Sequence, residues 1–128
     1  MNKLIELKNI VKNYNFKKKV KVLNKLSFSF SAGKIYSLMG PSGSGKSTLL
    51  NILSLIDTPT SGLLKINSRA INYSSISSND ILRAKKIGII YQDNNLLSDF
   101  TALENIYFAR LSIDDDKKKA VIESKKLL

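Results

Sequence analysis

The stretch GPSGSGKS, residues 40–47, decides how this sequence of 128 residues folds. It fits the pattern G-x-x-x-x-G-K-[ST] at every fixed position, between an apolar run and a run with helical spacing. Glycines let successive backbone N–H groups turn inward around a phosphate, because no Cβ stands in the way. Lys46 supplies a positive charge for the terminal phosphates, Ser47 can bind Mg²⁺, and the following helix points its positive end at the same anion. These features predict a nucleotide-binding loop and disfavour a Gly-Ser turn that matches the pattern by chance.

Hydrophobic patterning around this loop predicts an α/β domain. Residues 4–11 (LIELKNIV) and 20–33 (VKVLNKLSFSFSAG) alternate, which indicates two antiparallel strands, with one face of the second in water. Thr101 and Glu104 have capping-box spacing, so a helix is expected to begin there. Further strands are expected at 34–39, 63–67 and 87–92, and those at 34–39 and 87–92 are expected to be buried. Three more helices are expected: one directly after the glycine-rich loop, one at 79–86 with Asn79 or Asp80 as cap, and one from 112 onward. Surface loops are expected at 13–19 and 68–80, and an irregular segment at 93–100.

The composition limits the chemistry. There is no cysteine and no histidine, so disulfides, thiolate metal sites and imidazole bases are excluded. The formal net charge is +11, and 18 of the 21 cations are lysine. Because the lysines are scattered and aromatic residues are not interleaved with them, we expect a solvated surface and no nucleic-acid partner. No apolar run approaches the ~18 residues of a membrane span, and Glu6 and Lys8 stand where a signal peptide would be apolar. These features predict a cytosolic protein.

A second candidate site ends the apolar run IGIIYQD, residues 87–93. An acid at the end of a buried strand often holds Mg²⁺ or activates water, which makes Asp93 a candidate. The run is interrupted by Gly88 and Tyr91, however, and no second acid follows directly. Its spacing after the phosphate loop and the following NNLLSDFTALENI favour Gln92 as the functional residue.

Residues 3–111 resemble the ATPase subunits of ABC transporters. The segments that carry the resemblance are KNIVKNYNFKKKVKVLNKLSFSFSAGKIYSLMGPSGSGKSTLLNILSLIDTPTSGLLKIN and IGIIYQDNNLLSDFTALENI. The wording of GPSGSGKSTLLNIL and FTALENI looks most like the lipoprotein-releasing and macrolide-export subgroup. The family implies a P-loop NTPase fold of the α/β class: a RecA-like core with an N-terminal antiparallel β subdomain, here incomplete at the C-terminus. Lys34 departs from the glutamate usual in the family and is expected on the surface.

The resemblance also implies roles for individual residues. Tyr14 resembles the aromatic residue that stacks on adenine, with Phe16 as its rival and an ordinary loop tyrosine as the alternative. Gln92 resembles the glutamine that contacts Mg²⁺ and the attacking water, so it and Lys46 are the catalytic candidates, and residues 93–97 would face a membrane subunit. Ser47 and Gln92 are the Mg²⁺ candidates. The candidates for ATP binding are Tyr14, Gly40, Pro41, Ser42, Gly43, Ser44, Gly45, Lys46, Ser47 and Thr48.

Other parts of the family's machinery are missing from these 128 residues. No two glycines are adjacent, so there is no Ser-Gly-Gly signature; there is no Asp-Glu pair for the second acidic motif, and no histidine for the switch position. Hydrolysis needs a carboxylate to orient water and further donors to the γ-phosphate. We therefore expect residues 1–128 to be the N-terminal part of one nucleotide-binding domain that cannot hydrolyse ATP alone. The strand beside the phosphate-loop strand would be missing, which would expose apolar surface and unpaired strand edges.

The predicted function is an ATP-binding subunit that couples ATP hydrolysis to transport. Its expected partners are a transmembrane permease subunit and a second nucleotide-binding subunit, and its expected place is the inner face of the cell membrane, held there by the permease. One alternative is a degenerate module that binds nucleotide without turnover. Another is a soluble ABC ATPase acting on ribosomes or nucleic acid, although the Pro-Ser pair in GPSGSGKST is typical of transporters. A small-molecule kinase or GTPase is least favoured, since no Asn-Lys-x-Asp motif occurs.

Overall fold

The computed structural model describes residues 3–15, 19–113 and 116–128. The chain forms two compact units, Met1–Asn79 and Asp80–Leu128, and the division falls inside a helix.

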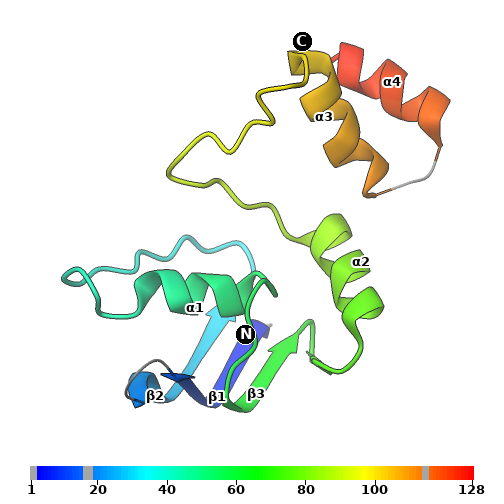
Figure 1. Ribbon diagram of the computed structural model, residues 1–128. Helices are drawn as coiled ribbons and strands as arrows, with labels where there is room; N and C mark the ends of the chain where they lie inside the picture. The colour runs from blue at the N-terminus through cyan, green and yellow to red at the C-terminus, as the bar shows by residue number, and fades with distance from the viewer. Residues whose placement is uncertain (1–2, 16–18, 114–115) are drawn as a thin grey trace. The chain divides into compact units, whose positions relative to one another are not determined.

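A four-stranded antiparallel sheet is the foundation of the first unit (Figure 1). Its order is β2-β1-β3-β4, so β1 pairs with both β2 and β3. The bounds are β1 Lys3–Asn15, β2 Lys19–Ser31, β3 Ser61–Ile66 and β4 Arg69–Ala70. The antiparallel pair predicted at 4–11 and 20–33 is confirmed, as is the strand at 63–67. The loop predicted at 13–19 was wrong up to Asn15 and at Lys19, because β1 and β2 continue their pairing to these residues.

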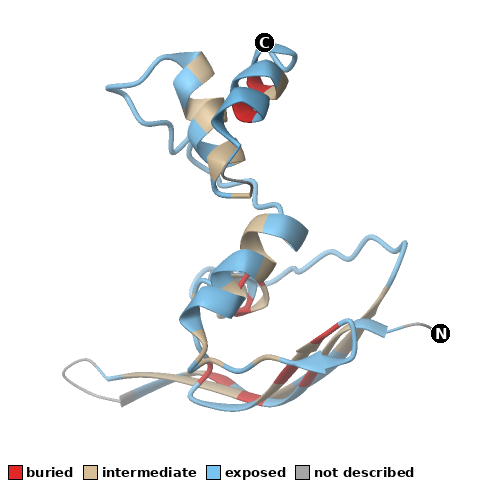
Figure 2. Ribbon diagram, turned by 90° about the vertical axis from the view of Figure 1, so that its right-hand side faces the viewer, coloured by how far each residue is buried: buried red, intermediate tan, exposed pale blue. Residues whose placement is uncertain are grey.

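Helix α1 (Lys46–Leu53) lies across one face of this sheet (Figure 1). Buried apolar side chains from both layers form the core. In Figure 2, stretches of the strand ribbons are coloured as buried. Burial of such side chains stabilises the fold by roughly 1.5–3 kcal/mol each. The buried apolar residues of this unit are Leu7, Ile10, Leu23, Leu49, Ile52, Leu55, Leu64 and Ile66.

Two buried strands predicted from the sequence are not formed. Residues 34–39 and 87–92 have no regular secondary structure, and Ile35, Met39 and Ile90 are 101%, 86% and 101% exposed. An apolar run becomes a strand only when neighbouring strands take up its backbone N–H and C=O groups. Among the described residues, neither segment pairs with the sheet. Large apolar side chains are exposed in both segments.

The second unit holds the end of helix α2 (Ile76–Lys86) and two further helices. The helix predicted at 79–86 exists but begins earlier, so Asn79 and Asp80 lie inside it and do not cap it. The prediction of a loop over 68–80 was therefore wrong for β4 and for the first turns of α2. A turn with side-chain bonds precedes the helix, since Asn72 Oδ1 accepts from the Ser74 N–H at 3.0 Å. Serine and asparagine favour such turns as readily as loops.

Helices α3 (Ala102–Leu111) and α4 (Lys117–Lys125) pack together and complete the second unit. The predicted capping box is confirmed, because Thr101 Oγ1 accepts from the Glu104 N–H while the Glu104 carboxylate accepts from the Thr101 N–H. Arg110 of α3 pairs with Glu123 of α4. The helix predicted from residue 112 begins at Lys117 with Asp116 as cap and ends at Lys125. Residues 114 and 115 of that prediction lie outside the described residues.

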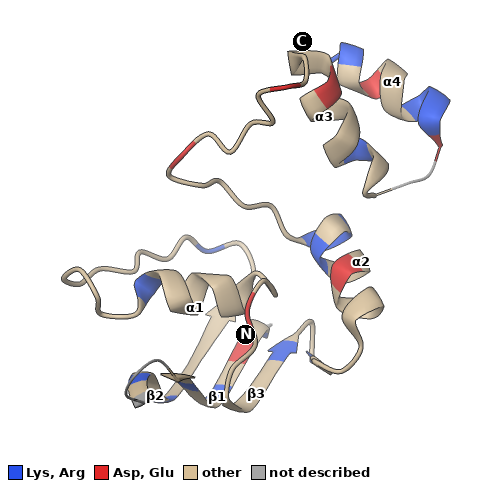
Figure 3. Ribbon diagram, viewed as in Figure 1, with Lys and Arg blue, Asp and Glu red and all other residues tan. Residues whose placement is uncertain are grey.

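Charged residues are dispersed over the described chain. Figure 3 shows both signs on α2, α3 and α4, and lysines along the strands. The irregular segment predicted at 93–100 is confirmed. Over the described ranges, no helix combines the length and the apolar character that a membrane crossing needs.

Candidate functional site

The phosphate-loop segment, residues 40–48, runs directly into helix α1. Gly45 is the residue before the helix and has φ 90° and ψ 9°, a left-handed conformation that favours glycine. Its carbonyl accepts the Leu49 N–H at 2.9 Å, the first hydrogen bond of the helix. Gly43 also has positive φ, at 77°. The glycines of the motif therefore occupy conformations in which other residues would be strained.

Strand β2 forms a wall beside the loop. A Cβ placed on Gly45 would lie 3.1 Å from Val22 Cγ1, 3.1 Å from Leu23 Cδ2 and 3.2 Å from Val22 O. Leu23 pairs with Lys12 of β1. The start of α1 is thus packed against the β1–β2 hairpin, which ties the loop to the sheet.

Lys46 bends back over the loop that precedes it. Its Nζ donates to Gly40 O and Pro41 O, both at 2.7 Å, and lies 3.5 Å from Ser44 Oγ. The ammonium is therefore held at the loop by carbonyl oxygens, which a phosphate oxygen could replace as acceptor. Pro41, Ser42 and Ser47 are exposed, and Thr48 is half-buried.

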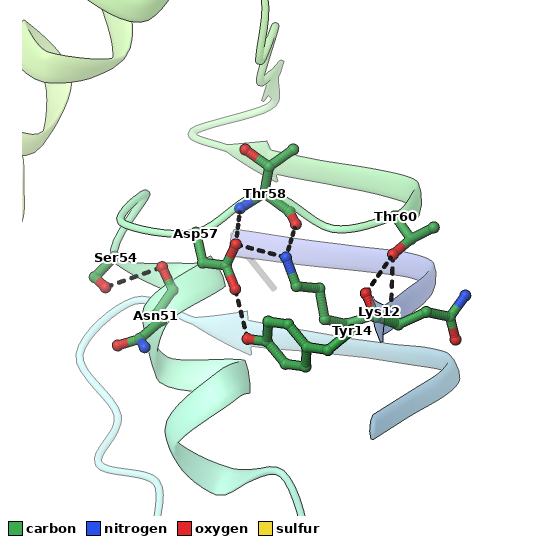
Figure 4. A network of polar contacts seen from close by, with 8 residues as sticks. Lys12, Tyr14, Asn51, Ser54, Asp57, Thr58 and Thr60 are labelled. Atoms are coloured by element: carbon green, nitrogen blue, oxygen red, sulfur yellow. Dashed lines mark hydrogen bonds and ion pairs between the residues drawn. The ribbon is translucent and has the colours of Figure 1, made fainter. Parts of the chain in front are cut away.

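Tyr14, the predicted adenine-stacking residue, is held by a polar network (Figure 4). Its hydroxyl donates to Asp57 Oδ2 at 2.7 Å. Lys12 Nζ donates to Asp57 Oδ1 at 2.6 Å and to Thr58 O at 2.7 Å, and it lies 4.8 Å from the centroid of the Tyr14 ring. Residues 12 and 14 are two apart on β1, so their side chains share one face of the strand. The tyrosine is thus part of a fixed cluster and is half-buried.

The carboxylate of Asp57 is the centre of this cluster. Partial burial raises its pKa, but the side-chain hydrogen bonds from Lys12 and Tyr14 and the Thr58 N–H outweigh that effect. Together they hold the pKa of Asp57 below its ordinary value of 3.8. The group is ionised at neutral pH and acts as an acceptor for three donors.

Gln92 and Asp93 belong to the second unit. Both are exposed residues of segment 87–97, which forms neither helix nor strand. The first unit brings together the phosphate loop, the β1–β2 hairpin and Tyr14, while an approach of Gln92 to the loop stays a prediction. Phe16, the rival of Tyr14, lies outside the described residues.

Sequence reasoning missed Asp57 and Lys12. Asp57 follows the apolar run LLNILSLI, and Lys12 stands two residues before Tyr14. An acid follows an apolar run at residue 57 as it does at residue 93, and this signal points to Asp57. What could not be foreseen is the return of Asp57 to strand β1.

The residues present fit a nucleotide with its magnesium ion. The loop offers glycine backbone, a lysine ammonium and the Ser47 hydroxyl at a helix start. In the described ranges no group of three or more His, Cys, Asp or Glu side chains could hold a metal by itself. Mg²⁺ commonly takes several ligands from water and substrate phosphates, so one hydroxyl is compatible with an ion that arrives with the nucleotide.

Known proteins resemble this chain closely. The family model described as ABC transporter matches residues 23–127. The lipoprotein-releasing system ATP-binding protein LolD of Rickettsia bellii is 38% identical over 128 residues, or 99% of this chain and 56% of the relative. LolD of Rickettsia felis is 42% identical over 129 residues, with the same coverage. LolD of Wigglesworthia glossinidia brevipalpis is 44% identical over 104 residues, or 80% of this chain and 45% of the relative. The chain spans about half the length of the curated relatives it matches.

Solved structures give the same result. The ATP-binding cassette MJ0796, a dimer bound to ADP and Pi, superposes with a TM-score of 0.79 at 32% identity, covering 93% of this chain and 54% of that one. For cbiO1 from Clostridium perfringens, part of the ABC transporter complex cbiONQ, the TM-score is 0.71 at 26% identity, covering 93% and 47%. These structures confirm the predicted P-loop NTPase fold, and the family match includes the phosphate loop. The chain therefore belongs to the ABC transporter family.

Proposed function

We propose that the chain binds ATP with Mg²⁺ and forms the N-terminal part of a nucleotide-binding domain that powers an ABC transporter. The observation that carries the proposal is the phosphate loop itself. Its glycines adopt left-handed conformations, its lysine ammonium points back at Gly40 and Pro41, and helix α1 starts directly after it. The known structure bound to ADP and Pi supports nucleotide binding by this fold.

The proposal assigns each loop residue a task. The backbone of residues 40–45 would surround the phosphates, Lys46 would exchange its carbonyl acceptors for phosphate oxygens, and Ser47 would hold Mg²⁺. Tyr14 would stack on the adenine. The bound ion would supply charge neutralisation at the phosphates.

The test is equilibrium binding of MgATP to the 128-residue chain, to Lys46→Ala and to Lys34→Ala. Lys34 is an exposed lysine of the segment that leads to the loop, so its variant removes the same charge outside the motif. Loss of the Lys46 ammonium should weaken binding by about tenfold or more, since charge-assisted hydrogen bonds contribute ~1.5–3 kcal/mol. Equal affinity of the two variants would contradict the proposal.

Turnover is expected only in the intact domain. Gln92 would contact Mg²⁺ and orient the attacking water there, but the 128 residues contain no histidine and no Asp-Glu pair. This observation favours a second candidate for the chain by itself: a module that binds ATP without hydrolysing it. Comparing affinity with steady-state phosphate release separates the two. If the purified chain released phosphate and Lys46→Ala abolished that release, the expected inability to hydrolyse ATP would be disproved.

The finer function is proposed from the relatives. The names of the LolD proteins support lipoprotein release as the transport process. The dimer of MJ0796 and the cbiONQ complex support a second nucleotide-binding subunit and a membrane permease as partners. The intact protein would then lie in the cytoplasm against the inner face of the membrane. Its recovery in the membrane fraction should require the permease subunit; equal recovery without that subunit would contradict this.

A further inference from the structure

The cluster around Asp57 connects the two ends of the nucleotide-binding region. Helix α1 begins at the phosphate loop and ends at Leu53, a length of ~12 Å for its eight residues. Beyond its end, the N–H groups of Ile56 and Asp57 both donate to Asn51 O, at 2.9 and 3.1 Å. The backbone of Asp57 is therefore fastened to the helix that follows the loop.

Both ends of this helix are attached to the same hairpin. At its start, Gly45 packs against Val22 and Leu23 of β2. At its far end, the Asp57 carboxylate binds Lys12 and Tyr14 of β1. Since Leu23 pairs with Lys12, the two attachments lie on neighbouring parts of one strand pair. The distance between the loop and the Tyr14 ring is thereby set by contacts at both ends of α1.

Two contacts orient the ring of Tyr14, one at its hydroxyl and one over its face. The carboxylate holds the hydroxyl at 2.7 Å, and the Lys12 ammonium lies 4.8 Å from the ring centroid. Lys12 is itself fixed, because its side chain is only 11% exposed and donates to two oxygens. A ring whose direction is set before a ligand arrives loses less side-chain freedom on binding.

We propose that Asp57 and Lys12 are positioning residues that orient Tyr14 for a purine base at a set distance from the phosphate loop. The inference rests on the proposed ATP binding and adds to it a source of affinity for the base. Neither residue needs to touch the nucleotide. Their effect would be confined to the base end of the ligand.

The experiment compares two ligands, MgATP and magnesium tripolyphosphate, on the full 128-residue chain. The affinity for MgATP divided by the affinity for tripolyphosphate isolates the contribution of the nucleoside. Asp57→Asn, Lys12→Met and Tyr14→Phe should each lower this ratio by about threefold to tenfold, the size of one side chain's lost preorganisation. Affinity for tripolyphosphate should stay within about twofold of the wild type, because the loop contacts are unchanged.

Two comparisons distinguish positioning from general support of the fold. Tyr14→Phe keeps the ring and the Lys12–Asp57 ion pair and removes only the hydroxyl, so it decides the question if Asp57→Asn fails to fold. Asp57→Asn should change the ratio less in the Tyr14→Phe background than in the wild type, since both substitutions remove the same hydrogen bond between Tyr14 and Asp57. Lys8→Met is the control on the same strand, because Lys8 is 54% exposed and contacts only Glu6 among the ion pairs of the described residues.

The outcomes separate the two proposals. The proposed function would be disproved if Lys46→Ala weakened the binding of neither ligand. Wild-type binding combined with an unchanged ratio in folded Tyr14→Phe would overturn the positioning role alone. A fall in affinity for both ligands by the same factor would also overturn it, because that result would show general support of the fold.

Discussion

Lys12 Nζ lies 2.6 Å from Asp57 Oδ1, although 45 residues separate the two in sequence. The pair joins the sheet to the turn that follows helix α1. Both side chains are shielded, with exposures of 11% and 25%. A charge pair in such a place stabilises the fold only while both partners are present.

Lys12→Met is therefore expected to destabilise the first unit. It leaves a partly buried carboxylate without its cation, at a cost of about 2 kcal/mol. Urea unfolding followed by far-UV circular dichroism measures the loss. Lys8→Met removes a lysine that is 54% exposed and 3.5 Å from Glu6, and it should cost less than about 1 kcal/mol. Equal losses in the two variants would show that the Lys12–Asp57 pair contributes nothing beyond a surface contact.

The Asp57 carboxylate is expected to make the stability of the fold depend on pH. The pKa of Asp57 is lower in the folded chain than its ordinary value of 3.8, so the folded state favours the ionised form. That stabilisation is present above about pH 4 and disappears as the pH falls through the folded pKa. The difference in unfolding free energy between wild type and Asp57→Asn should be constant from about pH 5 to 7 and shrink toward about pH 3. A difference that stays constant to the lowest pH would contradict the assignment; Asp93→Asn, at an exposed site, is the control.

The elements that sequence reasoning predicted correctly are those specified by local patterns. Alternation in residues 4–11 and 20–33 predicts the antiparallel strand pair, while the register shifts along that pair are not visible in the alternation. The glycine spacing of the phosphate loop reflects backbone conformations that few other residues adopt. The Thr101 and Glu104 pair caps a helix through contacts within one turn.

The errors concern interactions between distant segments. The apolar runs at 34–39 and 87–92 predict burial, but a strand also needs neighbours for its backbone, and apolarity does not reveal whether they are present. Asp57 was missed for a related reason. Its partners on β1 come close only after helix α1 has folded back over the sheet. Local signals do not report such contacts.

Gly62 is predicted to tolerate no side chain. Its φ is 105°, and a Cβ there would lie 2.5 Å from Asn9 O and 2.7 Å from Ile10 Cα. These atoms belong to β1 at the irregular part of its pairing with β3, so the backbone itself would have to move. Gly62→Ala should cost about 3 kcal/mol, from overpacking added to the left-handed conformation. Gly33→Ala is the matched control, with φ 68° and nothing within 4 Å, and it should cost about 1 kcal/mol in the same urea titration. Similar losses would show that conformation alone matters.

Asn105 is predicted to hold the loop that precedes helix α3. Its Oδ1 accepts from the Leu97 N–H at 2.8 Å, and its Nδ2 donates to the carbonyls of Leu97, Phe100 and Thr101 at 3.0–3.2 Å. This loop adjoins residues 93–97, which the resemblance to ABC transporter ATPases predicts to face a membrane subunit. Asn105→Ala removes all four bonds, so the Leu97 amide should exchange hydrogen about fivefold to tenfold faster, equivalent to roughly 1 kcal/mol of lost protection.

Hydrogen exchange resolved at single amides is the measurement for this prediction. Asn94→Ala changes an exposed asparagine of the same segment and should leave the Leu97 amide unaffected. Asn105→Asp keeps an acceptor for the Leu97 N–H but loses the donors, so the amide at 97 should stay protected while the end of the loop at Phe100 loosens. If Asn105→Ala left exchange at Leu97 unchanged, the Asn105 side chain would not be what holds the loop. The conformation of this segment would then depend on the Thr101 cap alone.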